Sequence, residues 1–239
     1  MKGQSPYALA FSFIIFVDKL RLLDFLGDFT LPRTESKMRN GQMGFNVTTD
    51  ENLDFYTASL RRDFTINTIG YEVYSKKILD PFNGINDLEN KILKAVNLEK
   101  FSEDPLRVFR LVRFANILNF TIDNDLFFLA KQMCDDGLLH QLSHERIYNE
   151  LKIIFKKSQK PSHAFLLFHK LNALQYLHPL NQINKEDLVE IFSYLDNVKS
   201  LNIKEETTNT LLYFTLLCYK FNDKQVSEFI MHLTNQKSL

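Results

Sequence analysis

A carboxylate and a guanidinium stand three residues apart at Asp104 and Arg107, inside the run Glu-Asp-Pro-Leu-Arg at residues 103–107. Residues at this spacing share one side of a helix. A carboxylate only accepts hydrogen bonds, and a guanidinium only donates them. The pair therefore fits a flat edge that sets an amino donor beside a ring acceptor, as cytosine and adenine do. Guanine and uracil present the reverse order, so the spacing predicts selection of C and A.

The element that positions this pair is expected to be a helix. Pro105 suits a first turn, where its missing N–H is no loss. Arg110 and Arg113 continue the three-residue spacing of Arg107 and are left for phosphates. A solvated charged face is the simpler alternative, and spacing alone favours it. The buried stripe of this helix is predicted at Val108, Leu111, Val112 and Ala115.

Residues 103–107 resemble the nucleotide-selecting motif of class II tRNA nucleotidyltransferases, the family of CCA-adding enzymes and bacterial poly(A) polymerases. Those enzymes build CCA on tRNA without a nucleic-acid template. The resemblance implies that Asp104 and Arg107 read the base, and that Arg110 and Arg113 support the triphosphate. It also implies ATP, CTP and tRNA as partners, although it does not separate CCA addition from A, CC or poly(A) addition.

A second motif, Arg-Arg-Asp-Phe-Thr-Ile-Asn at residues 61–67, resembles another signature of the same family. The resemblance implies that Asp63 and Asn67 meet the ribose hydroxyls and that Arg62 meets the triphosphate or the base. A ribose contact makes chemical sense because the 2′-OH distinguishes NTP from dNTP. Without the resemblance, a basic pair before the alternating strand at 69–74 reads as an exposed sheet edge.

A third, weaker match is Asp-Pro-Phe-Asn-Gly at residues 80–84. It is interpreted either as a flexing joint between two parts of the protein or as a plain connector. The three matches follow the order in which the family carries them, which makes the resemblance more specific than any one of them.

The family's metal-binding signature is the important absence. The family's head opens with Gly-Gly-x-Val-Arg-Asp. An Asp-x-Asp pair follows, and its carboxylates hold the Mg²⁺ expected for the family. This succession of the two patterns does not occur in these 239 residues. Metal ions neutralise phosphate charge and orient the attacking oxygen. Without the carboxylates that hold these ions, catalysis is in doubt. Asp28 is a candidate catalytic carboxylate in a segment, 28–35, that resembles a late strand of the head; a surface strand residue is the alternative.

The resemblance implies an N-terminally shortened enzyme that begins inside the family's head. Two other readings stay open. One is a catalytically inactive remnant that binds nucleotide or RNA, or a subunit whose missing head strands come from a separate chain. The other is an unstable fragment of a broken reading frame.

The fold class expected is α+β: a remnant of a polymerase-β-like nucleotidyltransferase head with a few-stranded sheet, then an all-α neck and body. The domains expected are a partial head at 1–80, a neck at 81–160 and a tRNA-binding body at 161–239. Residues 21–31 read as a hairpin and 36–53 as a mobile loop. Glu145, Arg146 and Glu150 are interpreted as braces of the neck. Helices are predicted at 123–134, 143–155, 164–174, 185–198, 207–221 and 224–233.

Composition sets wider bounds. The chain has 29 Lys and Arg against 29 Asp and Glu, so its net charge gives no hint of nucleic acid. A local basic stretch at 152–160 could meet tRNA phosphates, but a solvated face is the stronger reading. The 22 Phe predict an aromatic core. The two cysteines do not have the spacing of paired metal ligands. So few cysteines predict a protein of the reducing cytoplasm. The apolar run 8–17 is too short to span a bilayer, so no membrane partner is expected.

Overall fold

The computed structural model describes residues 33–37, 45–49, 53–72, 75–201, 203 and 205–234. These residues belong to two compact units, 1–103 and 104–239, and each is described by itself. Asp28 and the hairpin predicted at 21–31 lie outside the described residues.

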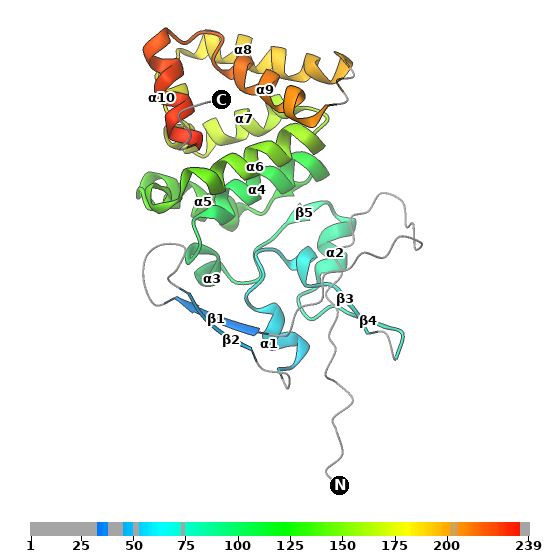
Figure 1. The fold of residues 1–239 in the computed structure, drawn as a ribbon. Helices are drawn as coiled ribbons and strands as arrows, with labels where there is room; N and C mark the ends of the chain where they lie inside the picture. The colour runs from blue at the N-terminus through cyan, green and yellow to red at the C-terminus, as the bar shows by residue number, and fades with distance from the viewer. Residues whose placement is uncertain are drawn as a thin grey trace. The chain divides into compact units, whose positions relative to one another are not determined.

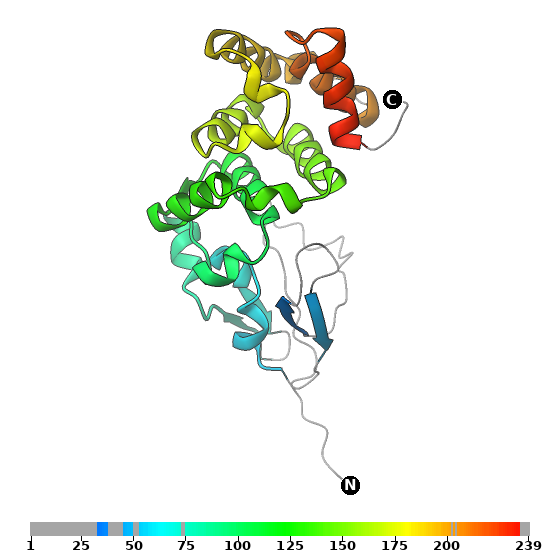
Figure 2. The same ribbon diagram turned by 90° about the vertical axis from the view of Figure 1, so that its left-hand side faces the viewer.

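The first unit contains a hairpin that the sequence did not suggest. Strand β1 (Arg33–Lys37) pairs antiparallel with β2 (Phe45–Thr49), with Arg33 opposite Thr49 (Figure 2, blue). The prediction of a loop over all of 36–53 was therefore wrong. Phe45–Thr49 reads Phe-Asn-Val-Thr-Thr, and aromatic and β-branched residues favour a strand over a loop.

A second hairpin follows the Arg-Arg-Asp motif. Strand β3 (Gly70–Glu72) pairs antiparallel with β4 (Lys77–Leu79), which confirms the first part of the strand predicted at 69–74. The motif itself ends in a short 3-10 helix, η1 (Thr65–Thr68). The other elements of this unit are α1 (Phe55–Ser59), α2 (Gly84–Glu89), β5 (Ile92–Leu93) and α3 (Leu98–Ser102).

The second unit is almost entirely helical (Figure 1, green to red). Helix α4 packs against α6 and α7, α7 against α8, α8 against α9, and α6 against both α9 and α10. The bounds are α4 (Leu106–Leu118), β6 (Thr121–Ile122), α5 (Asn124–Asp135), α6 (His144–Lys157), α7 (Pro161–Lys170), α8 (Lys185–Asn197), α9 (Glu206–Leu217) and α10 (Asp223–Thr234). Short 3-10 turns connect them: η2 (Leu138–Gln141), η3 (Ala173–Tyr176), η4 (Leu180–Gln182) and η5 (Val198–Leu201).

Aromatic side chains form much of the helical core, as the phenylalanine content predicts. Phe155 of α6 stacks on Tyr213 of α9, with ring centroids 4.5 Å apart and planes within 2°. Phe165 of α7 also stacks on the Phe155 ring, with the two ring centroids 6.0 Å apart. All three side chains are buried. Aromatic burial of this size stabilises a small helical unit strongly.

Helix boundaries follow local sequence signals in some places and not in others. The Asp123 carboxylate accepts from the N–H groups of Asp125 and Leu126, and Gly137 takes a positive φ just after α5, the helix expected at 123–134. Ser143 occupies the N-cap position of α6, but its side chain makes no capping hydrogen bond. The serine at this position, which would predict a capped start for the helix expected at 143–155, therefore does not cap it.

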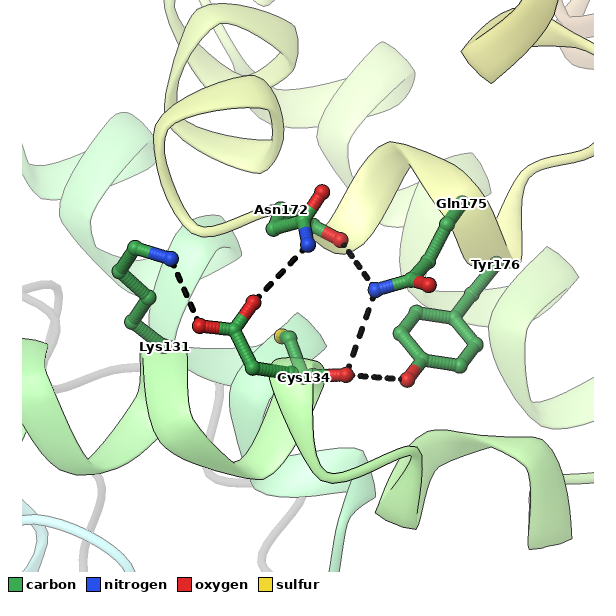
Figure 3. A network of polar contacts seen from close by, with 6 residues as sticks. Lys131, Cys134, Asn172, Gln175 and Tyr176 are labelled. Atoms are coloured by element: carbon green, nitrogen blue, oxygen red, sulfur yellow. Dashed lines mark hydrogen bonds and ion pairs between the residues drawn. The ribbon is translucent and has the colours of Figure 1, made fainter.

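The end of α5 is tied to η3 by side chains (Figure 3). Tyr176 and Gln175 both donate to the carbonyl oxygen of Cys134, at 2.5 and 3.2 Å. The Asn172 amide donates to Asp135, which also pairs with Lys131. These bonds satisfy acceptors that the last turn of any helix leaves open.

The described residues thus form a few-stranded α+β unit and a helical unit, which is the class expected. No helix among the described residues is long and apolar enough to cross a membrane. The domain boundaries at residues 80 and 160 stay predictions.

Candidate nucleotide-binding residues

Asp104 lies in the turn that starts helix α4. Its carboxylate accepts from the backbone N–H of Leu106 at 3.1 Å, and its carbonyl accepts from the N–H of Arg107 at 3.0 Å. The acidic side chain therefore holds one open N–H group at the start of the helix, and its backbone carbonyl holds the next, where the helix dipole favours negative charge. The predicted buried stripe is confirmed, since Val108, Leu111, Val112 and Ala115 are all buried.

Arg146 of α6 holds Asp104 from the other side. The guanidinium Nη2 donates to both carboxylate oxygens, at 3.1 and 3.2 Å, and each side chain is 22% exposed. A carboxylate offers about four acceptor positions, so these contacts and the Leu106 N–H do not exhaust it. Arg146 is thereby confirmed as a brace.

Arg113 and Glu150 form a second link between α4 and α6. The guanidinium lies 3.1 Å from the carboxylate, and the side chains are only 12% and 8% exposed. Arg113 also lies over the ring of Phe114, with its central carbon 4.7 Å from the centroid. Glu150 is thus also confirmed as a brace, and Arg113 has a structural task beside the triphosphate contact predicted for it.

Arg110 lies near the same ring, with its central carbon 5.7 Å from the Phe114 centroid. Arg107 and Arg110 are partly buried. A contact with an aromatic face orients a guanidinium, and the N–H groups in the plane of the guanidinium can still donate to a ligand.

The Arg-Arg-Asp motif builds a compact polar turn in the first unit. The Asp63 carboxylate accepts from the Asn67 amide at 2.7 Å and from the backbone N–H of Phe64 at 3.0 Å. Asp63 is 5% and Asn67 9% exposed, so only an edge of each side chain faces solvent. Arg62 is partly buried, and its backbone N–H donates to the Ser59 carbonyl at 2.9 Å.

Sequence reasoning missed what holds this turn. The Thr65 hydroxyl donates to the carboxylate of Asp87 at 2.7 Å, and both residues are buried. The Thr65 N–H donates to the Lys94 carbonyl at 3.0 Å. Thr65 and Asp87 are 22 residues apart, so no local pattern could have paired them.

Residues 80–84 bring helix α2 against η1. The Asp80 carboxylate accepts from the N–H groups of Gly84 and Ile85, at 2.6 and 3.0 Å, and so caps the helix. A Cβ on Gly84 would lie 2.3 Å from the Thr65 carbonyl oxygen, so this close approach requires glycine. The segment is therefore a specific packing joint, whether or not it also flexes.

Within the described residues, the side chains do not fit a magnesium site. One Asp-x-Asp spacing does occur, at 123–125, but there Asp123 caps helix α5 in the helical unit. Within the described part of the chain, no three His, Cys, Asp or Glu side chains cluster as metal ligands. Asp28 lies outside that part.

The basic stretch after the braces is partly neutralised. Lys152 and Lys156 both pair with Glu206 of α9, at 3.5 and 2.6 Å. The hydrogen bond from Lys156, and then the charges of both lysines, hold the pKa of the Glu206 carboxyl below its usual value. This favours the reading of a solvated, locally paired face.

Residues 24–94 match the family described as the poly(A) polymerase head domain, and residues 119–182 match the probable RNA and SrmB-binding site of polymerase A. A CCA-adding enzyme of Francisella tularensis subsp. tularensis is 35% identical over 190 residues, covering 77% of this chain and 51% of the relative. The chain belongs to the tRNA nucleotidyltransferase family.

Other relatives agree with this assignment. A multifunctional CCA protein of Acinetobacter baumannii is 39% identical over 158 residues, covering 64% of this family member and 37% of the relative. A solved CCA-adding enzyme in its apo form II shares the fold with a TM-score of 0.69 at 19% identity, covering 87% of this chain and 49% of that one. A tRNA nucleotidyltransferase solved with a primer tRNA and an incoming ATP analogue has a TM-score of 0.66 and 25% sequence identity. The match covers 78% of this chain and 57% of that one. This family member spans about half the length of the Francisella relative.

Proposed function

We propose that this chain binds CTP and ATP and holds tRNA, and that it carries the nucleotide-selecting part of a CCA-adding reaction. One observation supports the proposal most: Asp104, in the selecting motif, is fixed at the start of α4 by the Leu106 N–H and by Arg146. Fixing a carboxylate before the ligand arrives lowers the ordering cost of binding. Solved relatives bound to CTP, to ATP and to tRNA support the choice of ligands.

In this proposal Asp104 accepts from the exocyclic amino group of the base, and Arg107 donates to the neighbouring ring acceptor. Asp63 and Asn67 meet the ribose hydroxyls along their exposed edges, while Arg62 meets the triphosphate or the base. Arg110 and Arg113 support the triphosphate. The chemistry that Mg²⁺ supplies in such reactions is charge neutralisation and orientation of the attacking hydroxyl. Because the described residues do not fit that ion, no transfer step is assigned to them.

A second candidate function follows from the same observation. The chain would be a nucleotide- and RNA-binding protein without transferase activity of its own, or the partner of a separate chain that supplies metal-binding carboxylates.

One experiment separates the two. The purified chain is incubated with tRNA lacking its 3′ end, Mg²⁺ and labelled CTP or ATP, and nucleotide affinity is titrated in parallel. Binding with incorporation supports the transferase. Binding of CTP and ATP without incorporation supports the second candidate. Failure to bind either nucleotide contradicts both.

A further inference from the structure

The buried bond between Thr65 and Asp87 connects helix α2 to the turn that carries Asn67. Thr65 donates at 2.7 Å, and Thr65 and Asp87 are each 5% exposed. A hydrogen bond to a charged acceptor is stronger than a neutral one. A buried carboxylate is costly unless it is well hydrogen-bonded, so its use here calls for an explanation.

The turn is short and is fixed at its first residue. Thr65 receives three restraints: its hydroxyl is held by Asp87, its N–H by the Lys94 carbonyl, and its carbonyl accepts from the Thr68 hydroxyl at 2.6 Å. Asn67 lies two residues further on and donates to Asp63 at 2.7 Å. The orientation of the Asp63–Asn67 pair therefore depends on where Thr65 is held.

Helix α2 is itself built to deliver Asp87. Asp80 caps its start, and the missing side chain of Gly84 lets the helix approach the Thr65 carbonyl. The Asp87 N–H donates to the Asn83 carbonyl at 3.3 Å. The restraint on the turn thus comes from an element outside the Arg-Arg-Asp motif.

We infer that Asp87 is a positioning residue for sugar recognition: through Thr65 it sets the Asp63–Asn67 pair against the 2′-OH of the incoming nucleotide. This inference rests on the proposed function, because it takes Asp63 and Asn67 as the sugar contacts. A loosened turn would lose the contact to the 2′-OH first. The affinity for CTP would then fall more than the affinity for dCTP, and the preference for the ribonucleotide would shrink.

The test measures the affinities of the full chain for CTP and dCTP, both as magnesium complexes, by calorimetric titration. Thr65→Val removes the hydroxyl and keeps the shape of the side chain. We expect the ratio of the two affinities to fall roughly three- to tenfold, the size of one hydrogen bond. Thr65→Ser, which keeps the hydroxyl, should restore the ratio. A purely structural role would lower the melting temperature without moving this ratio.

The chain offers a matched control. Thr57 makes the same kind of bond to Asp54, at 3.0 Å, in helix α1 of the same unit. Thr57→Val should leave the CTP to dCTP ratio unchanged. If Thr65→Val does not fold, Asp87→Asn retains an oxygen acceptor without the charge, and a smaller fall in the ratio is expected.

The outcomes are distinct. An unchanged ratio in folded Thr65→Val or Asp87→Asn overturns the inference and leaves the proposed function standing. A wild-type chain that binds CTP and dCTP equally well removes the assumed ribose contact, and the inference falls with it. A wild-type chain that binds neither nucleotide overturns the proposed function itself.

Discussion

Arg146 and Asp104 are 42 residues apart in the chain, and one guanidinium nitrogen lies within 3.2 Å of both carboxylate oxygens. Asp104, in the turn before α4, is thereby attached to a helix that lies outside its own motif. Arg113 and Glu150 form a second such pair at 3.1 Å, nine residues after Asp104 and four residues after Arg146. The two helices are joined at two places by pairs of opposite charge.

Replacement of Arg146 tests the first pair. Arg146→Ala should lower the free energy of unfolding by about 1–2 kcal/mol, because it removes hydrogen bonds to a carboxylate that is largely shielded from solvent. It should also weaken CTP and ATP binding, since Asp104 loses its fixed orientation. Urea unfolding and nucleotide titration measure the two effects. The control is Lys131→Ala, which breaks the exposed Lys131–Asp135 pair and should change stability by less than about 0.5 kcal/mol. Equal effects of the two variants would contradict a special role for Arg146.

The base-reading role of Arg107 makes a separate prediction. Arg107→Ala should weaken CTP and ATP binding by about 1–3 kcal/mol, the usual cost of losing a charged hydrogen-bond partner. Weak binding of GTP and UTP should change less, because Arg107 is not matched to their edges. Lys185→Ala, at the start of α8, serves as a control for loss of positive charge. Titration curves for CTP that coincide in wild type and variant would contradict the assignment.

The Arg113–Glu150 pair is the more buried of the two links. Glu150→Ala should destabilise the chain by about 3 kcal/mol, because it leaves a guanidinium with little exposure beside an empty space. Arg113→Met combined with Glu150→Leu should recover part of the loss, since an apolar pair carries no desolvation penalty. A double-mutant cycle by urea unfolding measures the coupling. Additive single effects would show that the pair is not coupled.

Gly84 should not tolerate a side chain. Gly84→Ala places a Cβ 2.3 Å from the Thr65 carbonyl oxygen, so α2 or η1 has to move, at a cost of about 1–3 kcal/mol. Glu89→Ala, at an exposed position of the same helix, should change stability by less than about 0.5 kcal/mol. Thermal unfolding followed by circular dichroism compares the two. A melting temperature of Gly84→Ala equal to that of wild type would show that the close approach is not fixed.

A cluster around Lys220 makes stability depend on pH. Its ammonium lies 3.1 Å from Asp187 and 2.8 Å from Glu190, and these hydrogen bonds hold the pKa of each carboxyl below its ordinary value of 3.8 or 4.5. A lowered pKa in the folded state stabilises the protein above the ordinary value, and this contribution is lost as the pH falls through the folded one. Lys220→Gln should therefore melt below wild type at pH 7, with the difference shrinking below about pH 4. A difference that stays constant from pH 7 to pH 3 would contradict the cause given.

Local signals predicted much of the helical unit. Asp123 and Gly137 mark the two ends of α5. A capping side chain and a glycine with positive φ each affect only the neighbouring turn of the helix, so both can be recognised from the local sequence. The apolar spacing around Val108 and Leu111 similarly predicted the buried face of α4. The braces at Arg146 and Glu150 came from the family resemblance, and the structure supplied their partners.

Features that depend on distant segments could not be read from the sequence. The Thr65–Asp87 bond joins residues that no periodicity relates, and the close approach at Gly84 depends on the path of another segment. The strand at Phe45–Thr49 was missed for a different reason. Its polar residues and neighbouring glycines resemble a loop, and pairing with Arg33–Lys37 decides the outcome.

The end of α6 has a practical consequence. The Lys199 ammonium donates to the carbonyls of Phe155 and Lys156, each at 3.0 Å, and so closes the last turn of the helix whose first half carries Arg146 and Glu150. A protein cut before residue 199 would leave those two carbonyls without this donor. Anyone who prepares a shorter piece to study nucleotide selection should therefore extend it past η5, even though that turn contributes no residue to the proposed contacts.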